Sequence, residues 1–71
     1  MSLRLLNRLR EERERLGLTQ AELAQRVGVS RKTVNTIENL VFAPSALLAI
    51  KLARTVGRKV EDIFWIDGAE E

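Results

Sequence analysis

Hydrophobic residues recur at helical spacing along most of the chain, and glycine or proline separates one run from the next. In the first run, Leu6, Leu9 and Leu16 are three and seven residues apart, which places them on one face of a helix. Gly17 follows directly and is suited to end that helix. No segment shows the sustained alternation of a β-strand, so the pattern predicts an all-α fold.

The second helix has the clearest predicted boundaries. Thr19 and Glu22 have the spacing of a capping box, in which each side chain bonds the backbone N–H of the other residue. Leu18 and Leu23 stand where a hydrophobic staple requires apolar residues. The pattern therefore predicts a helix that begins directly after Thr19 and ends just before Gly28.

Three further helices follow in the pattern. Ser30 is suited to cap the third helix, whose inward face is expected to consist of Val34, Ile37 and Glu38. The remaining two helices are expected at residues 46–56 and 60–65.

The second and third helices, joined by a short turn, have the arrangement of a helix-turn-helix motif. Gly28 supplies the left-handed residue that the sharp turn needs. Once Val34 and Ile37 face the core, four polar side chains at the start and middle of the third helix are left facing outward. Arginine and lysine can donate to guanine, asparagine pairs with adenine, and threonine contacts base edges or the thymine methyl group. The predicted base-contacting residues are Arg31, Lys32, Asn35 and Thr36.

Residues 16–28, LGLTQAELAQRVG, resemble the start of the Cro/C1-type (XRE) helix-turn-helix domain of phage repressors. The later segments SRKTV, IEN and AIKLA continue the similarity, which runs from about residue 6 to residue 64. The resemblance implies a compact, lambda-repressor-like five-helix bundle that binds the major groove of double-stranded DNA, as a homodimer on a two-fold operator. It supports the base contacts above and implies phosphate contacts from Gln20, Ser30, Thr33 and Asn39.

The loop after the third helix departs from the family's pattern. The family usually places glycine and then polar or basic residues before Pro-Ser, whereas this chain has Leu40, Val41, Phe42 and Ala43. Some of the family's usual phosphate contacts are therefore missing. The loop residues form an apolar patch instead, and Leu47 extends it. These side chains either fold inward or form a partner-binding surface or a modified dimer seam.

Arg13 stands on the apolar stripe of the first helix, where another leucine would complete the pattern. It either snorkels at the rim of the bundle or forms a buried ion pair with Glu38. The resemblance favours the pair, because phage repressors pair an arginine and a glutamate at these positions. Such a pair is structural and not catalytic.

The 71-residue chain contains neither histidine nor cysteine. It lacks the commonest general base, the commonest metal ligand and any thiol, so the composition disfavours an enzyme, a metal site or a cofactor site. No run of about 18 apolar residues exists that could span a membrane, and the N-terminus lacks the apolar core of a signal peptide. We expect a cytoplasmic, nucleoid-associated protein with one domain, residues 1–71, and a short acidic tail at residues 67–71.

Charge is distributed unevenly along the chain. Residues 19–59 contain seven basic and two acidic residues, whereas residues 60–71 contain five acidic residues and no basic one. A basic centre suits a polyanionic partner such as DNA. A charged surface that simply faces solvent has the same composition.

Four consecutive large apolar residues stand near the chain end, at positions 63–66. A short helix buries only part of such a run inside its own bundle, and the family's pattern assigns Ile63 and Phe64 to the core. Trp65 and Ile66 are then left for a partner, and tryptophan is enriched at interface hot spots. We therefore expect a homodimer with Trp65 and Ile66 in its interface.

Two functions from different classes fit the sequence. The first is a sequence-specific DNA-binding transcriptional regulator, a repressor in the manner of the phage proteins. The second is a protein-interaction module, such as an antitoxin-like adaptor that binds its partner through the apolar loop Leu40–Phe42. Its binding surface would comprise Val41, Phe42 and Leu47.

Overall fold

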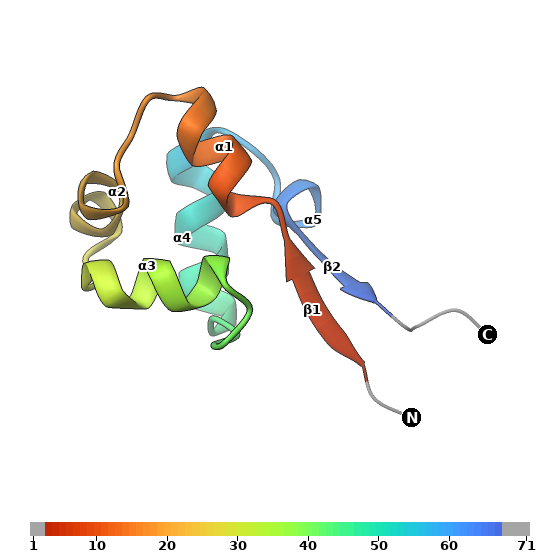
Figure 1. Cartoon of the computed structure of the whole chain (residues 1–71). Coiled ribbons are helices and arrows are strands. Elements are labelled where there is room, and N and C mark those ends of the chain that lie inside the picture. The colour runs from red at the N-terminus through yellow and green to blue at the C-terminus, as the bar shows by residue number, and fades with distance from the viewer. Residues whose placement is uncertain (1–2, 68–71) are drawn as a thin grey trace.

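The computed structural model describes residues 3–67 of the chain (Figure 1). Of the expected acidic tail at residues 67–71, only Asp67 lies within the described residues. The helices pack together, and two short strands from opposite ends of the chain pair beside them. In chain order the elements are β1 (Arg4–Asn7), α1 (Leu9–Arg15), α2 (Gln20–Val27), α3 (Arg31–Glu38), α4 (Ala46–Val56), α5 (Val60–Ile63) and β2 (Phe64–Asp67).

The expectation of an all-α fold is wrong at both ends of the chain. The start of the predicted first helix and the end of the predicted fifth helix are strands. β1 and β2 pair antiparallel, with Leu5 opposite Ile66 and Leu6 opposite Trp65. The fold is therefore mostly helical, with a small two-stranded sheet added to the five helices.

Asn7 separates strand β1 from helix α1. Its Oδ1 accepts a hydrogen bond from the backbone N–H of Leu9 at 3.0 Å, and its Nδ2 donates to the backbone carbonyl of Ile37 at 3.0 Å. An asparagine that takes up a nearby backbone N–H in this way competes with helix formation. The backbone N–H of Arg8 donates to the carbonyl of Ile63 at 2.9 Å. The chain before Leu9 consequently stays extended and pairs with β2.

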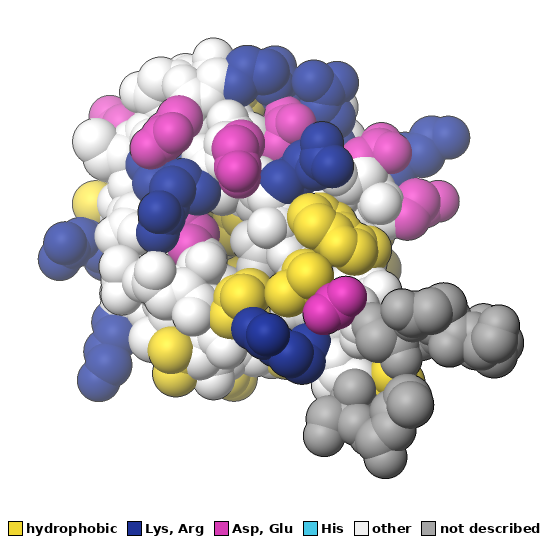
Figure 2. Space-filling model, turned by 45° about the vertical axis from the view of Figure 1, so that its right-hand side comes forward, with side chains coloured by type: hydrophobic (Ala, Val, Ile, Leu, Met, Phe, Trp, Pro, Cys, Tyr) yellow, Lys and Arg dark blue, Asp and Glu magenta, His cyan; other side chains and the backbone are white. Residues whose placement is uncertain are grey.

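The sheet leaves large apolar side chains at the surface. Phe64 is buried, as the family's pattern predicts, whereas Trp65 and Ile66 are 39% and 55% exposed. The guanidinium carbon of Arg8 lies 5.3 Å from the centroid of the Trp65 ring, which is a cation–π distance. Figure 2 shows hydrophobic side chains gathered on the side of the molecule that carries the sheet, with charged side chains around them.

Helices α2, α3 and α4 begin at capped residues, as the sequence predicts. Thr19 Oγ1 accepts from the backbone N–H of Glu22 at 3.0 Å, and Glu22 Oε1 accepts from the backbone N–H of Thr19 at 2.8 Å. Ser30 and Ser45 accept in the same way from the backbone N–H three residues later. These starting points are set locally, because each cap needs only residues within one helical turn.

Gly28 makes the turn between α2 and α3 possible. Its φ angle is +81°, in the left-handed region that residues with a Cβ rarely adopt. A Cβ built at this position meets only Lys51 Nζ, at 3.9 Å, so space is not the constraint. The requirement for glycine is therefore conformational.

The core lies between the helices and includes the charged side chains of Arg13 and Glu38. Leu9 and Arg13 of α1 are buried, while Leu16, expected on the same face, is 41% exposed because the helix ends at Arg15. The other buried apolar residues are Leu23, Ala24, Val27, Val34, Ile37, Leu52, Ala53, Val56, Ile63 and Phe64.

Within residues 3–67, no helix has the length and apolar character needed to cross a membrane.

The loop between α3 and α4 folds back over the last turn of α3. The backbone N–H groups of Val41 and Phe42 both donate to the carbonyl of Thr36, at 2.9 and 3.2 Å. Leu40 adopts a φ angle of +63°, which is strained for a residue with a Cβ. The side chains do not fold inward: Val41 is 76%, Phe42 48% and Leu47 69% exposed. The departure from the family's pattern thus produces an exposed apolar surface.

Leu40→Gly is expected to be more stable than Leu40→Ala by about 1 kcal/mol. Both changes remove the leucine side chain, but only alanine keeps a Cβ in the left-handed backbone conformation. Urea denaturation followed by circular dichroism measures both free energies of unfolding. At Val41, whose φ is not positive, the order should reverse, with alanine more stable than glycine. The same order at both positions would contradict strain at Leu40.

Candidate nucleic-acid interface

Helix α3 presents a polar face because its apolar positions are fixed in the core. Val34 and Ile37 are fully buried. Arg31, Lys32 and Asn35 lie on the outward side of the same helix and are exposed. The side chains that the sequence assigns to base reading are therefore open to a partner along the first turns of α3.

The hydroxyl groups of α3 are engaged within the helix. Thr36, which is half-buried, donates its hydroxyl hydrogen to the backbone carbonyl of Thr33 at 3.0 Å. Ser30 Oγ and Thr33 Oγ1 are 3.0 Å apart and share a hydrogen bond, while Ser30 also caps the helix. These three residues consequently lie close together along one side of α3.

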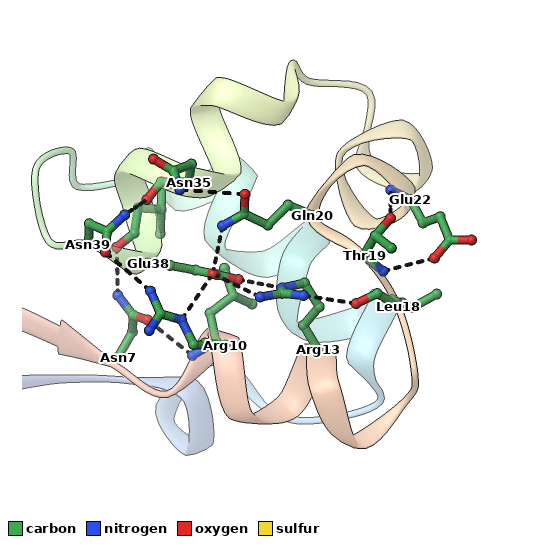
Figure 3. A network of polar contacts seen from close by, with 12 residues as sticks. Asn7, Arg10, Arg13, Leu18, Thr19, Gln20, Glu22, Asn35, Glu38 and Asn39 are labelled. Atoms are coloured by element: carbon green, nitrogen blue, oxygen red, sulfur yellow. Dashed lines mark hydrogen bonds and ion pairs between the residues drawn. The ribbon is translucent and has the colours of Figure 1, made fainter.

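A buried carboxylate connects the first three helices (Figure 3). The side chain of Glu38, on α3, has no exposed area, and it accepts from Arg13 Nε at 2.7 Å and from Arg13 Nη2 at 3.2 Å. Gln20, the first residue of α2, donates its Nε2 to Glu38 Oε1 at 3.0 Å. Arg13 Nη1 donates to the carbonyl of Leu18 at 2.9 Å. Arg13 is thus held inside the bundle by an ion pair and does not snorkel at its rim.

The surroundings of Glu38 stabilise its ionised form. Burial by itself would raise the pKa of this carboxyl group. Hydrogen bonds from Arg13 and Gln20, together with the charge of Arg13, outweigh burial and lower the pKa of Glu38 from its ordinary value of 4.5. A lowered pKa means that this interaction stabilises the fold at neutral pH. That contribution is lost on acidification, as the pH falls through the folded-state pKa.

Polar side chains extend this network to the surface. Arg10 Nη2 donates to Asn39 Oδ1 at 3.2 Å, and Arg10 Nε lies 3.5 Å from Glu38 Oε1. Asn39 Nδ2 in turn donates to the backbone carbonyl of Asn35 at 3.0 Å, and Asn35 Nδ2 lies 3.5 Å from Gln20 Oε1. The structure therefore brings Gln20, Asn35 and Asn39 together around the edge of one buried carboxylate.

Arg10 is a member of this network that the sequence analysis did not single out. Its side chain is 52% exposed, so the guanidinium has donors left for a partner. Arg10 precedes Arg13 by three residues, which puts both on the same side of α1. The three-residue spacing is visible in the sequence. It indicates a contact between Arg10 and Glu38 only when the position of Arg13 beside Glu38 is already known.

An open depression lies between α3 and the loop that follows it. Its volume is about 360 Å³. Val41 and Phe42 line the loop side, although the sequence associated neither residue with the base-reading face. The lining from α3 consists of Ser30, Lys32, Thr33 and Thr36.

Trp65 and Ile66 lie apart from this face. Both belong to β2, and Figure 1 shows the sheet projecting from the helices on the side opposite α2. Leu47, on α4, is exposed but does not line the depression beside α3. The apolar residues Val41 and Phe42 therefore line the depression beside α3, whereas Leu47, Trp65 and Ile66 do not.

The chemistry that the outward face of α3 offers is hydrogen bonding and positive charge. Arg31 and Lys32 donate hydrogen bonds without accepting any, whereas the amides of Gln20 and Asn35 do both. Within residues 3–67, no three His, Cys, Asp or Glu side chains come together as a possible metal site. The donors and acceptors of Arg31, Lys32, Gln20 and Asn35 are suited to hydrogen bonds with base edges and phosphate oxygens.

The chain is similar to known helix-turn-helix proteins in sequence. A family model described as helix-turn-helix matches residues 9–63. An uncharacterized HTH-type transcriptional regulator from Methanothermobacter thermautotrophicus is 52% identical over 60 residues, which is 83% of this chain and 87% of the relative. The uncharacterized HTH-type transcriptional regulator YgzD from Bacillus subtilis is 43% identical over 61 residues, 86% of this chain and 92% of the relative.

A solved structure shares the fold. The crystal structure of the clp gene regulator ClgR from Corynebacterium glutamicum matches with a TM-score of 0.72 and 30% sequence identity. The match covers 76% of this chain and 57% of the ClgR chain, so this chain corresponds to part of that protein. Relatives in both comparisons are named as regulators and not as enzymes.

Removal of either partner of the Arg13–Glu38 pair should destabilise the fold strongly. Arg13→Met leaves a buried carboxylate without its closest cation, and Glu38→Leu leaves a buried guanidinium without its anion. Each is expected to lower the free energy of unfolding by about 3–5 kcal/mol. The double variant should lose much less than the sum of both, because it contains no unpaired charge.

Thermal and urea denaturation of the four proteins measure this coupling. The more exposed pair of Arg58 and Glu12, whose atoms are 3.0 Å apart, is a suitable comparison and should show little coupling. Additive effects of Arg13→Met and Glu38→Leu would show that the two buried side chains do not stabilise each other.

Proposed function

The chain belongs to the Cro/C1-type helix-turn-helix family of transcriptional regulators, and from this premise we propose that it represses transcription by binding a two-fold operator as a homodimer. The observation that carries the proposal is the open polar face of α3, which projects arginine, lysine and asparagine side chains beside a buried ion-pair network. Long flexible donors on an exposed helix suit the major groove, which admits a helix and presents hydrogen-bonding groups at every base pair.

Base reading is assigned to the outward residues of α3. Arg31 and Lys32 lie in its first turn and can donate to the O6 and N7 atoms of guanine. Asn35 lies one turn later and can pair with adenine through its amide. Thr36 offers its methyl group, since its hydroxyl hydrogen is already bonded to the carbonyl of Thr33.

Phosphate binding is assigned to the side chains around this face. Gln20 uses one amide hydrogen for Glu38 and keeps the second for a phosphate oxygen. It also stands at the start of α2, where the helix dipole favours an anion. Ser30 and Thr33 at the start of α3, Asn39 at its end and Arg10 beside Asn39 complete the set.

Dimer formation is assigned to the β1–β2 sheet. Two strands of four residues each form a marginal sheet unless another surface covers them. Trp65 lies opposite Leu6, and Ile66 lies opposite Leu5, so each face of the sheet carries a pair of large apolar side chains. Because Trp65 and Ile66 point to opposite faces of the sheet, a second copy has to enclose the sheet to cover both. Such a dimer would leave both copies of α3 free to read half-sites about 34 Å apart.

A second candidate function rests on the exposed loop. Val41, Phe42 and Leu47 are large apolar side chains at the surface, and such side chains often contact another protein. An antitoxin-like adaptor would bind its partner through them and would not select a DNA sequence. Selection from a random duplex library therefore distinguishes the two functions.

That selection should enrich a two-fold sequence. Arg31→Ala is expected to weaken binding to the enriched site by about 1–3 kcal/mol and to relax the preference at one base pair in each half-site. Gln20→Ala should weaken binding evenly across sequences, because a phosphate contact carries no base information. Fluorescence anisotropy titrations on the enriched site and on its single-base variants measure both effects.

Arg54, an exposed arginine on α4, provides the control for loss of charge. Arg54→Ala removes the same charge as Arg31→Ala but should leave the base preference unchanged. Unchanged affinity and preference in Arg31→Ala would exclude this residue from base reading. A library from which no sequence is enriched would favour the adaptor function.

Trp65→Ala should convert a dimer into a monomer and weaken operator binding, while the helical circular dichroism signal stays largely intact. The physical reason is that Trp65 is the largest of the exposed apolar side chains on the sheet and that tryptophan is enriched at interface hot spots. Sedimentation velocity at micromolar concentrations measures the change. Leu47→Ala, an equally apolar change on α4, should leave the dimer intact. Wild-type protein that sediments as a monomer at high micromolar concentration would contradict this assignment.

A further inference from the structure

The depression beside α3 has walls that are held in place by backbone hydrogen bonds. Val41 and Phe42 form one wall, and both of their N–H groups are bonded to the carbonyl of Thr36. Because that carbonyl belongs to α3, the backbone of this wall is fixed relative to the helix that carries Lys32 and Thr36 on the opposite wall. Val41 is 76% and Phe42 48% exposed, so their apolar surface faces whatever approaches α3.

The opposite wall is less polar than its residue types suggest. Thr36 has donated its hydroxyl hydrogen to the carbonyl of Thr33, and the hydroxyls of Ser30 and Thr33 share a hydrogen bond. Because the hydroxyl groups are bonded in this way, the methyl groups of Thr33 and Thr36 are the parts of these side chains that remain available for contact with a partner. The depression is thus an apolar hollow with one cation, Lys32, at its edge.

The occupant of this hollow follows from its position. It adjoins Lys32 and Thr36, which the proposed function assigns to base reading, so a bound duplex would bring the major-groove edges of bases against it. Among the four bases, only thymine presents an apolar group in that groove, its C5-methyl. A protein partner in the same hollow would have to occupy the face of α3 itself.

We propose that Val41, Phe42 and Thr36 form a pocket for the C5-methyl group of a thymine, and that this contact helps to specify the operator. The inference rests on the proposed function and extends it to a loop that the family uses for phosphate contacts. Phosphate contacts do not depend on the DNA sequence. In this chain the apolar loop accordingly replaces part of them with a contact that distinguishes thymine from the other bases. Lys32 at the edge of the pocket remains available for the neighbouring base pair.

Replacement of thymine by deoxyuridine in the selected operator tests the proposal, because it removes only the methyl group. Each thymine of one half-site is replaced in turn, and affinity is measured by anisotropy. One position should lose about fourfold in affinity, the effect of returning one methyl group to water. Val41→Ser should weaken binding to the thymine site but not to the deoxyuridine site, so that the two affinities become nearly equal. Phe42→Ala should do the same.

Leu47→Ser is the control, because Leu47 is exposed and apolar but does not line the depression. It should retain the full difference between thymine and deoxyuridine. If no deoxyuridine substitution weakens binding, or if Val41→Ser weakens thymine and deoxyuridine sites alike, the methyl pocket is wrong while sequence-specific DNA binding stands. A protein that selects no duplex sequence overturns both the pocket and the proposed function.

Discussion

The carboxylate of Glu38 is the group on which the arrangement of the first three helices depends. An unpaired carboxylate inside a protein is costly, so the fold is stable only when donors from other helices reach it. Arg13 from α1 and Gln20 from α2 supply those donors. Apolar packing is non-directional and tolerates small rotations of one helix against another. A two-pronged hydrogen bond between a guanidinium and a carboxylate is directional, so this interaction fixes an orientation that the small core alone specifies less sharply.

The same interaction reaches the surface and prepares it for a ligand. Gln20 contributes one amide hydrogen to the buried carboxylate, and its oxygen faces the amide of Asn35. Asn39 is held between Arg10 and the backbone of α3. Side chains that are already restrained lose less conformational entropy when they bind, by about 0.5–1.5 kcal/mol for each one. The polar groups that complete the fold are therefore also those best prepared to contact a polyanion.

Two pairs of exposed apolar residues lie in different settings, and the backbone around each pair indicates a different use. The backbone N–H groups of the loop residues Val41 and Phe42 are bonded to a single carbonyl group of α3, so the backbone of the loop is fixed to that helix. The sheet residues Trp65 and Ile66 lie on a two-stranded element that projects away from that helix. A chain of this size has few large apolar side chains, and those left at the surface are unavailable to its core. Their separation allows one group to face DNA and the other to face a second copy.

The features of this protein that could be predicted from its residues alone depend on neighbours within one helical turn. The capping box at Thr19 is of this kind, and so are the limits of α2 and α4 and the outward face of α3. The buried ion pair was one of two alternatives for Arg13, and the resemblance to phage repressors favoured it over snorkelling. The sheet was not predictable, since Leu5 pairs with Ile66 across almost the whole chain, and short runs of adjacent apolar residues fit a helix or a strand equally well. The place of Val41 beside Thr36 was equally hidden, because no spacing in the sequence shows that two loop N–H groups will share one helix carbonyl. The sheet and the loop depend on pairing between distant parts of the chain, because every backbone donor and acceptor that leaves water must find a partner, and the partners available are known only in the folded chain.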